Sequence, residues 1–418
     1  MPPKFWPRLS LFFLVLSAIF LPWQTKLILS PAVSTYWEIS LFVAFVPVWL
    51  SILSLIPSGL IRLENFQRLP FLWRLSAAVF FVASGLSVFI SPDPLLSFYH
   101  WLLWLSAILF FIFLRQCPSS WKRILAFIFL GSLAAQAFIG LWQFFNQLSF
   151  ASSYLGIAAH QAGDLGAAVI ETADSRWLRA YGASDHPNIF GGLMAMASLA
   201  ILYCLRFSKN LRFRFPLLAA YSLFLTALLC SFSRAAFLAF GVGLVIFIFS
   251  ERAYLKARVH LAALIFFLSA AIIFLFSWQY SELIWARTQL SNRLEQTSLN
   301  ERQQFNQRAF KDLQNAPWLG TGIGASTIFD READLVKGRE LLFWQYQPAH
   351  NYWLLAATES GIFGAIALLL IWFFAYKKSR HHRFLGLFAA LFILTLFDHW
   401  LFSLPLGAAW VFFFFALI

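Results

Sequence analysis

The chain has 418 residues, is 61% hydrophobic and 12% charged, and carries a net charge of +13. A soluble domain typically has about 25% charged residues, so this composition excludes an ordinary soluble globular protein. Repeated apolar stretches of about 20 residues, separated by short basic loops, predict an all-α polytopic membrane protein.

Twelve apolar segments are expected to form transmembrane helices. They cover residues 9–23, 37–56, 72–90, 95–114, 122–145, 187–206, 215–230, 234–250, 259–278, 350–376, 384–402 and 404–418. No small-residue cleavage site follows the first segment, so we expect it to be a retained helix and not a signal peptide.

The distribution of basic residues predicts the orientation of the chain in the bilayer. One alternating set of loops holds most of the lysines and arginines: Lys4, Arg8, Arg62, Arg68, Arg74, Arg115, Lys122, Arg123, Arg206, Lys209, Arg212, Arg214, Arg252, Lys256, Arg258, Lys377, Lys378, Arg380 and Arg383. Only Glu64 and Glu251 accompany them. Cytoplasmic loops carry such an excess, so we expect this side and both termini to be cytoplasmic. The cytoplasmic loops then account for most of the net charge of +13, and no nucleic-acid partner is needed to explain it.

The opposite side carries one long polar insert between the ninth and tenth helices. The chain is thus expected to divide into nine helices in residues 1–276, a large periplasmic loop in residues 277–349 and three helices in residues 350–418. Loops of this length are usually functional or disordered.

Two short helices are expected inside this insert. Asn300 is predicted to cap a helix that ends before Pro317, and a second helix is predicted over Arg331–Phe343. The apolar face of the first helix consists of Phe305, Ala309 and Leu313. Arg302 falls on that face, where it needs an anionic partner, whereas Arg308 points away from it.

Several polar residues that are far apart in the sequence are predicted to lie at one level on the extracytoplasmic side. They are Arg179, Asp185, His186, Arg234, Arg302, His350, Asp398 and His399. Scattered solvated charges would not have to gather in this way.

His350 is the candidate general base. Pro348 and Asn351 are typical of a helix start, and the positive end of a helix dipole lowers the pKa of a histidine and attracts anions. A neutral imidazole there can accept a proton. The alternative is an interfacial histidine that only caps the helix.

Arg234, Arg179 and Asp398 are the other candidates, each with an alternative explanation. A charge at the edge of the hydrocarbon layer is costly unless paired, so Arg234 is expected to bind an anion, although it could instead snorkel to the surface. Arg179 competes for a similar role with Arg176, and a loop arginine is often simply solvated. Asp398 could orient His350, as carboxylates often do for histidines, or form a hydrogen bond between helices.

Other motifs predict structural roles. Glu359 lies about 13 Å deeper than His350 by helix rise, too far for a role in the same site. A hydrogen bond within the bundle is therefore the better explanation for this acid than a catalytic role. Residues 320–324, with the sequence GTGIG, lack the strand and helix of a dinucleotide site, and a tight turn is expected. No metal-binding spacing occurs on the outer face, and the three cysteines contain no CxxC. We therefore expect neither a metal nor a cofactor.

These residues resemble the O-antigen ligase/polymerase family of polytopic glycosyltransferases. The matching pieces are residues 179–182 with 186–188, residues 231–234, Arg302 ahead of residues 317–322, and His350-Asn351 followed by residues 359–361. The similarity covers residues 175–400, and before it the chain matches only in being hydrophobic.

The resemblance implies a GT-C type membrane fold and a metal-independent, inverting glycosyltransferase that uses a glycan on undecaprenyl pyrophosphate. It suggests Arg179, Arg234 and Arg302 around the pyrophosphate, His350 as the base and Asp398 as a supporting acid. His186 and Asn351, in the same motifs, are predicted to contribute to substrate binding.

The length and the single large outer loop look more like a ligase of lipopolysaccharide biosynthesis, acting on lipid A–core at the periplasmic side of a bacterial inner membrane. A polymerase or a protein O-oligosaccharyltransferase of the same family is the alternative. A non-enzymatic lipid-glycan transporter and a scaffold for glycan assembly are the alternatives from other classes.

Overall fold

The computed structural model describes residues 5–61, 67, 69–208, 210–289, 293–339, 341–381 and 384–417. Six of the charges used above to orient the chain lie outside these residues: Lys4, Arg62, Glu64, Arg68, Lys209 and Arg383.

Each of the twelve expected apolar segments contains an apolar helix. These are α1 (Phe5–Phe20), α2 (Phe45–Leu55), α4 (Phe71–Phe89), α5 (Pro94–Gln116), α6 (Ser119–Asn146), α7 (Pro187–Phe207), α8 (Leu211–Cys230), α9 (Arg234–Ser250), α11 (Val259–Gln279), α15 (Tyr352–His381), α16 (Leu385–Phe397) and α18 (Pro405–Leu417). By length and composition, seven helices in the described ranges can cross a membrane, and five apolar helices are shorter. A polytopic, mainly α-helical protein is thus confirmed, while the number of crossings stays a prediction.

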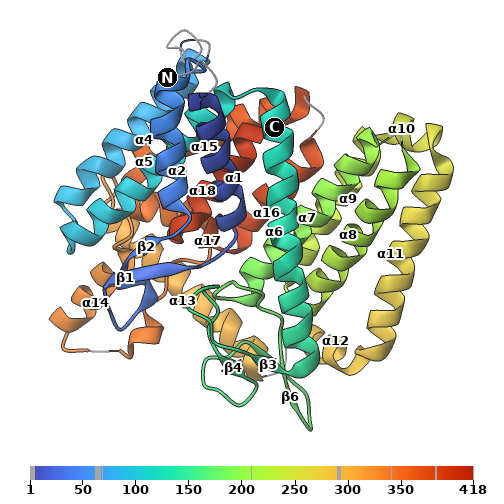
Figure 1. Cartoon of the computed structure of the whole chain (residues 1–418). Helices are drawn as coiled ribbons and strands as arrows, with labels where there is room; N and C mark the ends of the chain where they lie inside the picture. Colours follow the sequence, from blue (N-terminus) through green and yellow to red (C-terminus); the bar gives the residue numbers. More distant parts are fainter. Residues whose placement is uncertain are drawn as a thin grey trace.

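The helices form a bundle whose two ends differ (Figure 1). Both chain ends lie toward the end of the bundle that also carries α10 (Arg252–Ala257), and the small strands lie at the other end. The same far end carries α12 (Ser281–Thr288), α13 (Arg293–Asn315) and α14 (Ser326–Val336). Within the bundle, α15 packs along α4, α16 along α9, and α18 along α5.

The second expected helix, over residues 37–56, is wrong in its first part. A short 3-10 helix (Thr35–Trp37) and a strand, β2 (Ile39–Phe42), precede α2. The strand pairs antiparallel with β1 (Lys26–Ser30), with Lys26 opposite Phe42. Burial alternates along β2 from Ser40 to Phe42, and so short an apolar run does not distinguish a strand from a helix by sequence periodicity.

Two further strand pairs lie in the loop between α6 and α7. The strand β3 (Leu148–Ser149) pairs with β4 (His160–Gln161), and β5 (Val169–Glu171) pairs with β6 (Arg176–Leu178). Gln143 of α6 holds the end of this loop, because its side chain donates to the Gly182 carbonyl (2.8 Å) and accepts from the Gly182 amide (2.8 Å). The loop that carries Arg179 is therefore fixed to the bundle.

The two helices expected in the long insert begin earlier than the sequence predicts, and α12 was not expected. In α13, Asn300 is an interior residue and not a cap, because the face that contains Phe305 and Ala309 continues back to the buried Glu295. The second helix, α14, begins at Ser326 and ends before Gly338, whose φ of 68° suits a helix C-terminus. Phe343–Gln345 forms a separate 3-10 helix.

The glycine-rich turn after α13 inserts into a break in α15. Gly361 interrupts α15 with a φ of 69° and a ψ of 177°, and the Ile362 amide donates to the Pro317 carbonyl (2.9 Å). The Glu359 carboxylate accepts from the Gly324 amide (2.6 Å) and the Ser326 hydroxyl (2.8 Å). The turn expected at residues 320–324 is confirmed. Glu359 has hydrogen-bond partners, but they lie in the long insert and not within the bundle, where the sequence predicts them.

Candidate active site

The turn between α8 and α9 holds two arginine side chains by its carbonyl groups. Phe232 lies in the left-handed region (φ 46°), and Ser233 caps α9 by accepting from the Ala236 amide. The Nε of Arg179 donates to the Ser231 carbonyl (2.8 Å), and the Nε of Arg287 donates to the Phe232 carbonyl (3.3 Å). Both guanidinium groups are therefore fixed beside Arg234, the first residue of α9.

Glu295 of α13 lies between two of these arginines. Its Oε2 is 2.8 Å from Nη2 of Arg234, and its Oε1 pairs with Nη1 of Arg287. Glu295 is 5% exposed, whereas 38% of the Arg234 side chain is exposed. The first turn of α13 thus brings a buried carboxylate to the start of α9.

Asn188 links Arg179 to Asp398. Nη2 of Arg179 donates to Oδ1 of Asn188 (2.8 Å), and Nδ2 of Asn188 donates to Oδ2 of Asp398 (3.2 Å). Arg179 is only 4% exposed, whereas Arg176 lies on β6 and points to Glu171, 3.9 Å away. Arg179, and not Arg176, is therefore the arginine in the cluster.

His350 lies immediately before the cap of α15. Asn351 is the capping residue, since its Oδ1 accepts from the amides of Trp353 (3.0 Å) and Leu354 (2.9 Å). The His350 ring stacks on Phe305 of α13, with centroids 5.8 Å apart, and meets the edge of His399 at 4.9 Å. Its Nδ1 is buried and has no hydrogen-bond partner in the described part of the chain. One ring nitrogen is thus free to accept a proton.

Burial and neighbouring charges keep the His350 imidazole neutral. Burial, followed by the neighbouring His399 and Arg302, lowers the pKa of His350 to about 3. Asp398 and a hydrogen bond to the Pro348 backbone act on this pKa in the opposite direction. Burial also lowers the pKa of His399. Around neutral pH, His350 is therefore unprotonated, as a general base must be.

Asp398 is ionised but does not hydrogen-bond to His350. Burial would raise the pKa of Asp398, but the nearby His399, His350 and Arg302 bring it down to about 2. Its Oδ1 accepts from the His399 amide (2.8 Å), and its Oδ2 accepts from Asn188. The possibility that Asp398 orients His350 directly is thus not realised, and Asp398 acts on the histidine only through its charge.

Arg302 lies between the arginines at α9 and the histidines. Besides burial, its positive charge lowers the pKa of His350 on one side and the pKa values of Arg179 and Arg287 on the other. No hydrogen bond or ion pair joins it to another described residue. Glu295, Arg302 and Phe305 share one face of α13 because they are seven and three residues apart. This face connects the two halves of the cluster.

His186 and Asp185 have different surroundings. Nδ1 of His186 accepts from the Asn188 amide (3.1 Å) at the start of α7, and the residue is exposed. Asp185, which is also exposed, instead lies near Lys26 and Glu38. It borders a small cavity of about 20 Å³ that also touches Tyr36, whose ring meets that of His399 with centroids 5.9 Å apart. Asp185 thus lies beside the histidine end of the cluster.

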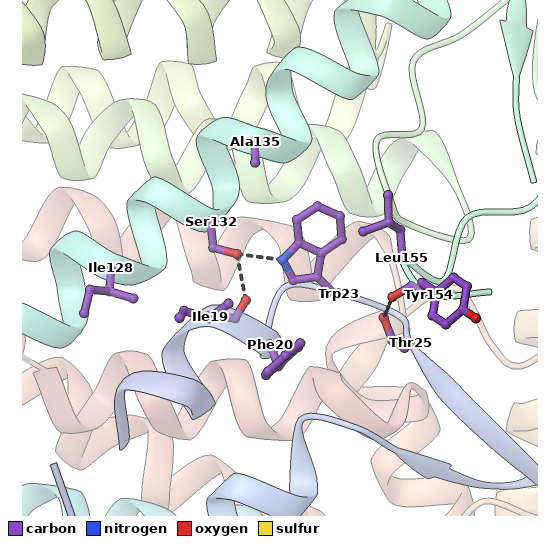
Figure 2. A pocket seen from close by; sticks show the side chains of 9 residues that line it. All are labelled: Ile19, Phe20, Trp23, Thr25, Ile128, Ser132, Ala135, Tyr154 and Leu155. Carbon is purple, nitrogen blue, oxygen red and sulfur yellow. Dashed lines mark hydrogen bonds between the residues drawn. The ribbon is translucent and has the colours of Figure 1, made fainter. Parts of the chain in front are cut away.

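A larger cavity of about 400 Å³ lies between α1 and α6 (Figure 2). Trp23 donates to the Ser132 hydroxyl (2.7 Å) in its wall, and Ser132 donates to the Ile19 carbonyl (2.7 Å). None of the residues that line it belongs to the arginine and histidine cluster. Within the described residues, no group of three or more His, Cys, Asp or Glu is placed to hold a metal ion.

Residues 217–369 match the family model described as O-Antigen ligase. Over these residues the chain is similar to the O-antigen ligase family. The match is shorter than the resemblance over residues 175–400, and includes Arg234, Arg302 and His350 but not Arg179 or Asp398. No significant match to a curated protein is found.

Three residues of the cluster were not among the candidates from the sequence. Arg287 and Glu295 are found only in the three-dimensional contacts, because a mixed polar insert offers many arginines and acids. Asn188 belonged to a matching motif, but nothing in its spacing indicated that it would bridge Arg179 and Asp398.

Proposed function

We propose that this protein belongs to the O-antigen ligase family and is an inverting glycosyltransferase that works without a metal ion. In this proposal, it moves a glycan from undecaprenyl pyrophosphate to a sugar hydroxyl of an acceptor, lipid A–core, at the periplasmic face of a bacterial inner membrane. Both termini would then be cytoplasmic. The helices in residues 1–276 and 350–418 would hold the lipid, and residues 277–349 would cover the site.

The observation that supports this proposal is the convergence of four guanidinium groups near a neutral histidine. They belong to Arg179, Arg234, Arg287 and Arg302, and two carboxylates, Glu295 and Asp398, accompany them. An uncompensated excess of buried charge is costly, so a multivalent anion is the expected partner. A diphosphate diester carries one ionised oxygen on each phosphorus and fits this requirement.

In the proposed reaction, His350 at one end of the cluster acts on the acceptor, and the arginines at the other end act on the leaving group. His350 takes the proton from the acceptor hydroxyl, whose oxygen forms a bond to the anomeric carbon from the face opposite the leaving group. The bond from that carbon to the phosphate oxygen breaks, and undecaprenyl pyrophosphate leaves with the electron pair. The arginines stabilise the departing charge. His186 and Asn351, at the starts of α7 and α15, are proposed to bind the glycan.

Purified protein with lipid-linked glycan tests this proposal. Lipid A–core, a second lipid-linked glycan, or an acceptor peptide is offered in separate reactions. Transfer to lipid A–core supports the ligase. Transfer to the second glycan or to the peptide would identify a polymerase or a protein-glycosylating enzyme instead. Movement of lipid-linked glycan across proteoliposomes without transfer to any acceptor would overturn the enzyme proposal in favour of a transporter.

A further inference from the structure

Glu295 is an unusual neighbour for a site that is proposed to bind an anion. It is 5% exposed and contacts Arg234 and Arg287. Although its Oε2 is 2.8 Å from Arg234, the two groups are not aligned for a hydrogen bond, and Oε2 has no hydrogen-bond partner among the described residues. Its Oε1 accepts a hydrogen bond from Nη1 of Arg287, so the carboxylate is held by a hydrogen bond at Arg287 and by charge alone at Arg234.

Arg287 is held from two sides, by a backbone carbonyl and by Glu295. Its Nε donates to the Phe232 carbonyl (3.3 Å), which leaves the Nη atoms for an anion. Burial, followed by the positive charge of Arg287, lowers the pKa of Arg179, so one carboxylate does not fully offset these cations. Guanidinium groups bind carboxylates and phosphates with the same two-pronged geometry.

We propose that the diphosphate of the donor binds where the Glu295 carboxylate lies, between Arg234 and Arg287. Arg287 is then a donor-binding residue, and Glu295 is a counter-ion that the donor displaces. This inference rests on the proposed function, since it places the diphosphate of that donor.

The geometry of α13 supports the replacement of the Glu295 carboxylate by the donor diphosphate. Glu295 is in the first turn of the helix, and Arg302 follows seven residues later on the same face. When the diphosphate replaces the carboxylate, Arg302 stays on the side toward His350, about 10 Å along the helix by its rise per residue. The diphosphate thus lies at the arginine end, and the first sugar points toward His350.

The test measures binding of geranyl pyrophosphate and of inorganic pyrophosphate to the full-length protein in detergent. Glu295→Gln keeps the shape of the side chain and removes its charge, so both ligands should bind about three- to tenfold more tightly, as expected from one partly buried charge pair. Arg287→Ala should bind at least about tenfold more weakly, and Arg287→Lys should not restore binding because it lacks the two-pronged donor.

Glu171→Gln is the matched control. Glu171 also contacts two arginines, Arg176 (3.9 Å) and Arg293 (3.2 Å), but on the exposed surface outside the cluster. Its removal should leave pyrophosphate binding unchanged. If Glu295→Gln does not fold, Glu295→Asp retains the charge on a shorter side chain and should still tighten binding to a smaller extent.

Unchanged or weaker pyrophosphate binding in a folded Glu295 variant, with normal binding by the wild-type protein, would overturn the inference and leave the proposed function standing. If the wild-type protein neither binds geranyl pyrophosphate nor transfers glycan, the proposed function itself fails.

Discussion

The guanidinium of Arg179 and the carboxylate of Asp398 are joined through one side chain, the amide of Asn188. This link connects the loop before α7 with the end of α16, and all three residues are buried. Asn188 uses its oxygen for the cation and its nitrogen for the anion, so a single amide positions both charges.

Replacing Asn188 should disturb both charges together. In Asn188→Ala, Arg179 loses an acceptor and Asp398 loses a donor, and leaving such buried groups unsatisfied costs about 1–3 kcal/mol each. We expect a lower unfolding temperature and a transfer rate reduced by at least tenfold, about 1.4 kcal/mol. Asn146→Ala is the control, because Asn146 donates only to the Trp142 carbonyl at an exposed position. A fully active Asn188→Ala protein would rule out this positioning role.

His350→Ala should abolish glycan transfer without abolishing donor binding. General base catalysis is typically worth about 10²–10⁴-fold in rate, and His350 contacts no arginine by hydrogen bond or ion pair among the described residues. The measurements are the transfer rate and the affinity for geranyl pyrophosphate in the same preparation. Transfer at the wild-type rate would show that another group takes the proton.

The pH dependence of kcat/KM should show an acid limb below pH 6.5, because that parameter reports the pKa values of the free enzyme. Burial first, and then the charges of His399 and Arg302, lower the pKa of His350 to about 3. The base is therefore active at pH values where an ordinary histidine is protonated.

The same shift affects stability in a defined direction. The unfolded chain binds a proton at His350 near pH 6.5 and the folded chain does not, so the free energy of unfolding should decline as the pH falls below 6.5 toward 3. In His350→Gln this decline should be smaller. An acid limb at or above pH 6.5 for the wild-type protein would contradict the burial of His350.

Arg234→Lys should lose most of the activity while the protein still folds. The side chain of Arg234 is 38% exposed, so its replacement leaves the packing of α9 intact. A lysine keeps the charge but cannot bind two phosphate oxygens in one plane, so KM for the donor should rise at least about tenfold. Arg176→Lys, at the exposed pair with Glu171, serves as the control and should retain activity.

Gly361→Ala should destabilise the protein by disrupting the break in α15. A Cβ at Gly361 would lie 2.0 Å from the Trp318 carbonyl oxygen, at a φ of 69° that disfavours other residues. In contrast, Gly131→Ala in α6 meets nothing within 4 Å and should be neutral or stabilising by up to about 1 kcal/mol. Thermal unfolding of the two variants measures the difference. Equal stability would mean that the glycine-rich turn does not need this break.

The sequence by itself was sufficient to locate the apolar helices. A helix that crosses a bilayer must be apolar over its whole length, so each of the twelve expected segments contains an apolar helix. The same analysis failed at residues 37–44 and at Asn300. A short apolar run fits both a strand and a helix, and a polar helix such as α13 depends on tertiary contacts for its first turns.

Some residues of the candidate site could likewise be predicted from the sequence, and others were found only in the structure. Arg179, Arg234, Arg302, His350 and Asp398 could be singled out because charged residues at the end of an apolar helix or on an apolar face need a partner. Their partners could not be named from the sequence. Asn188, Arg287 and Glu295 are ordinary polar residues whose importance comes from contacts across large sequence separations, and only the packing of α7, α12 and α13 around the α8–α9 turn brings those contacts together.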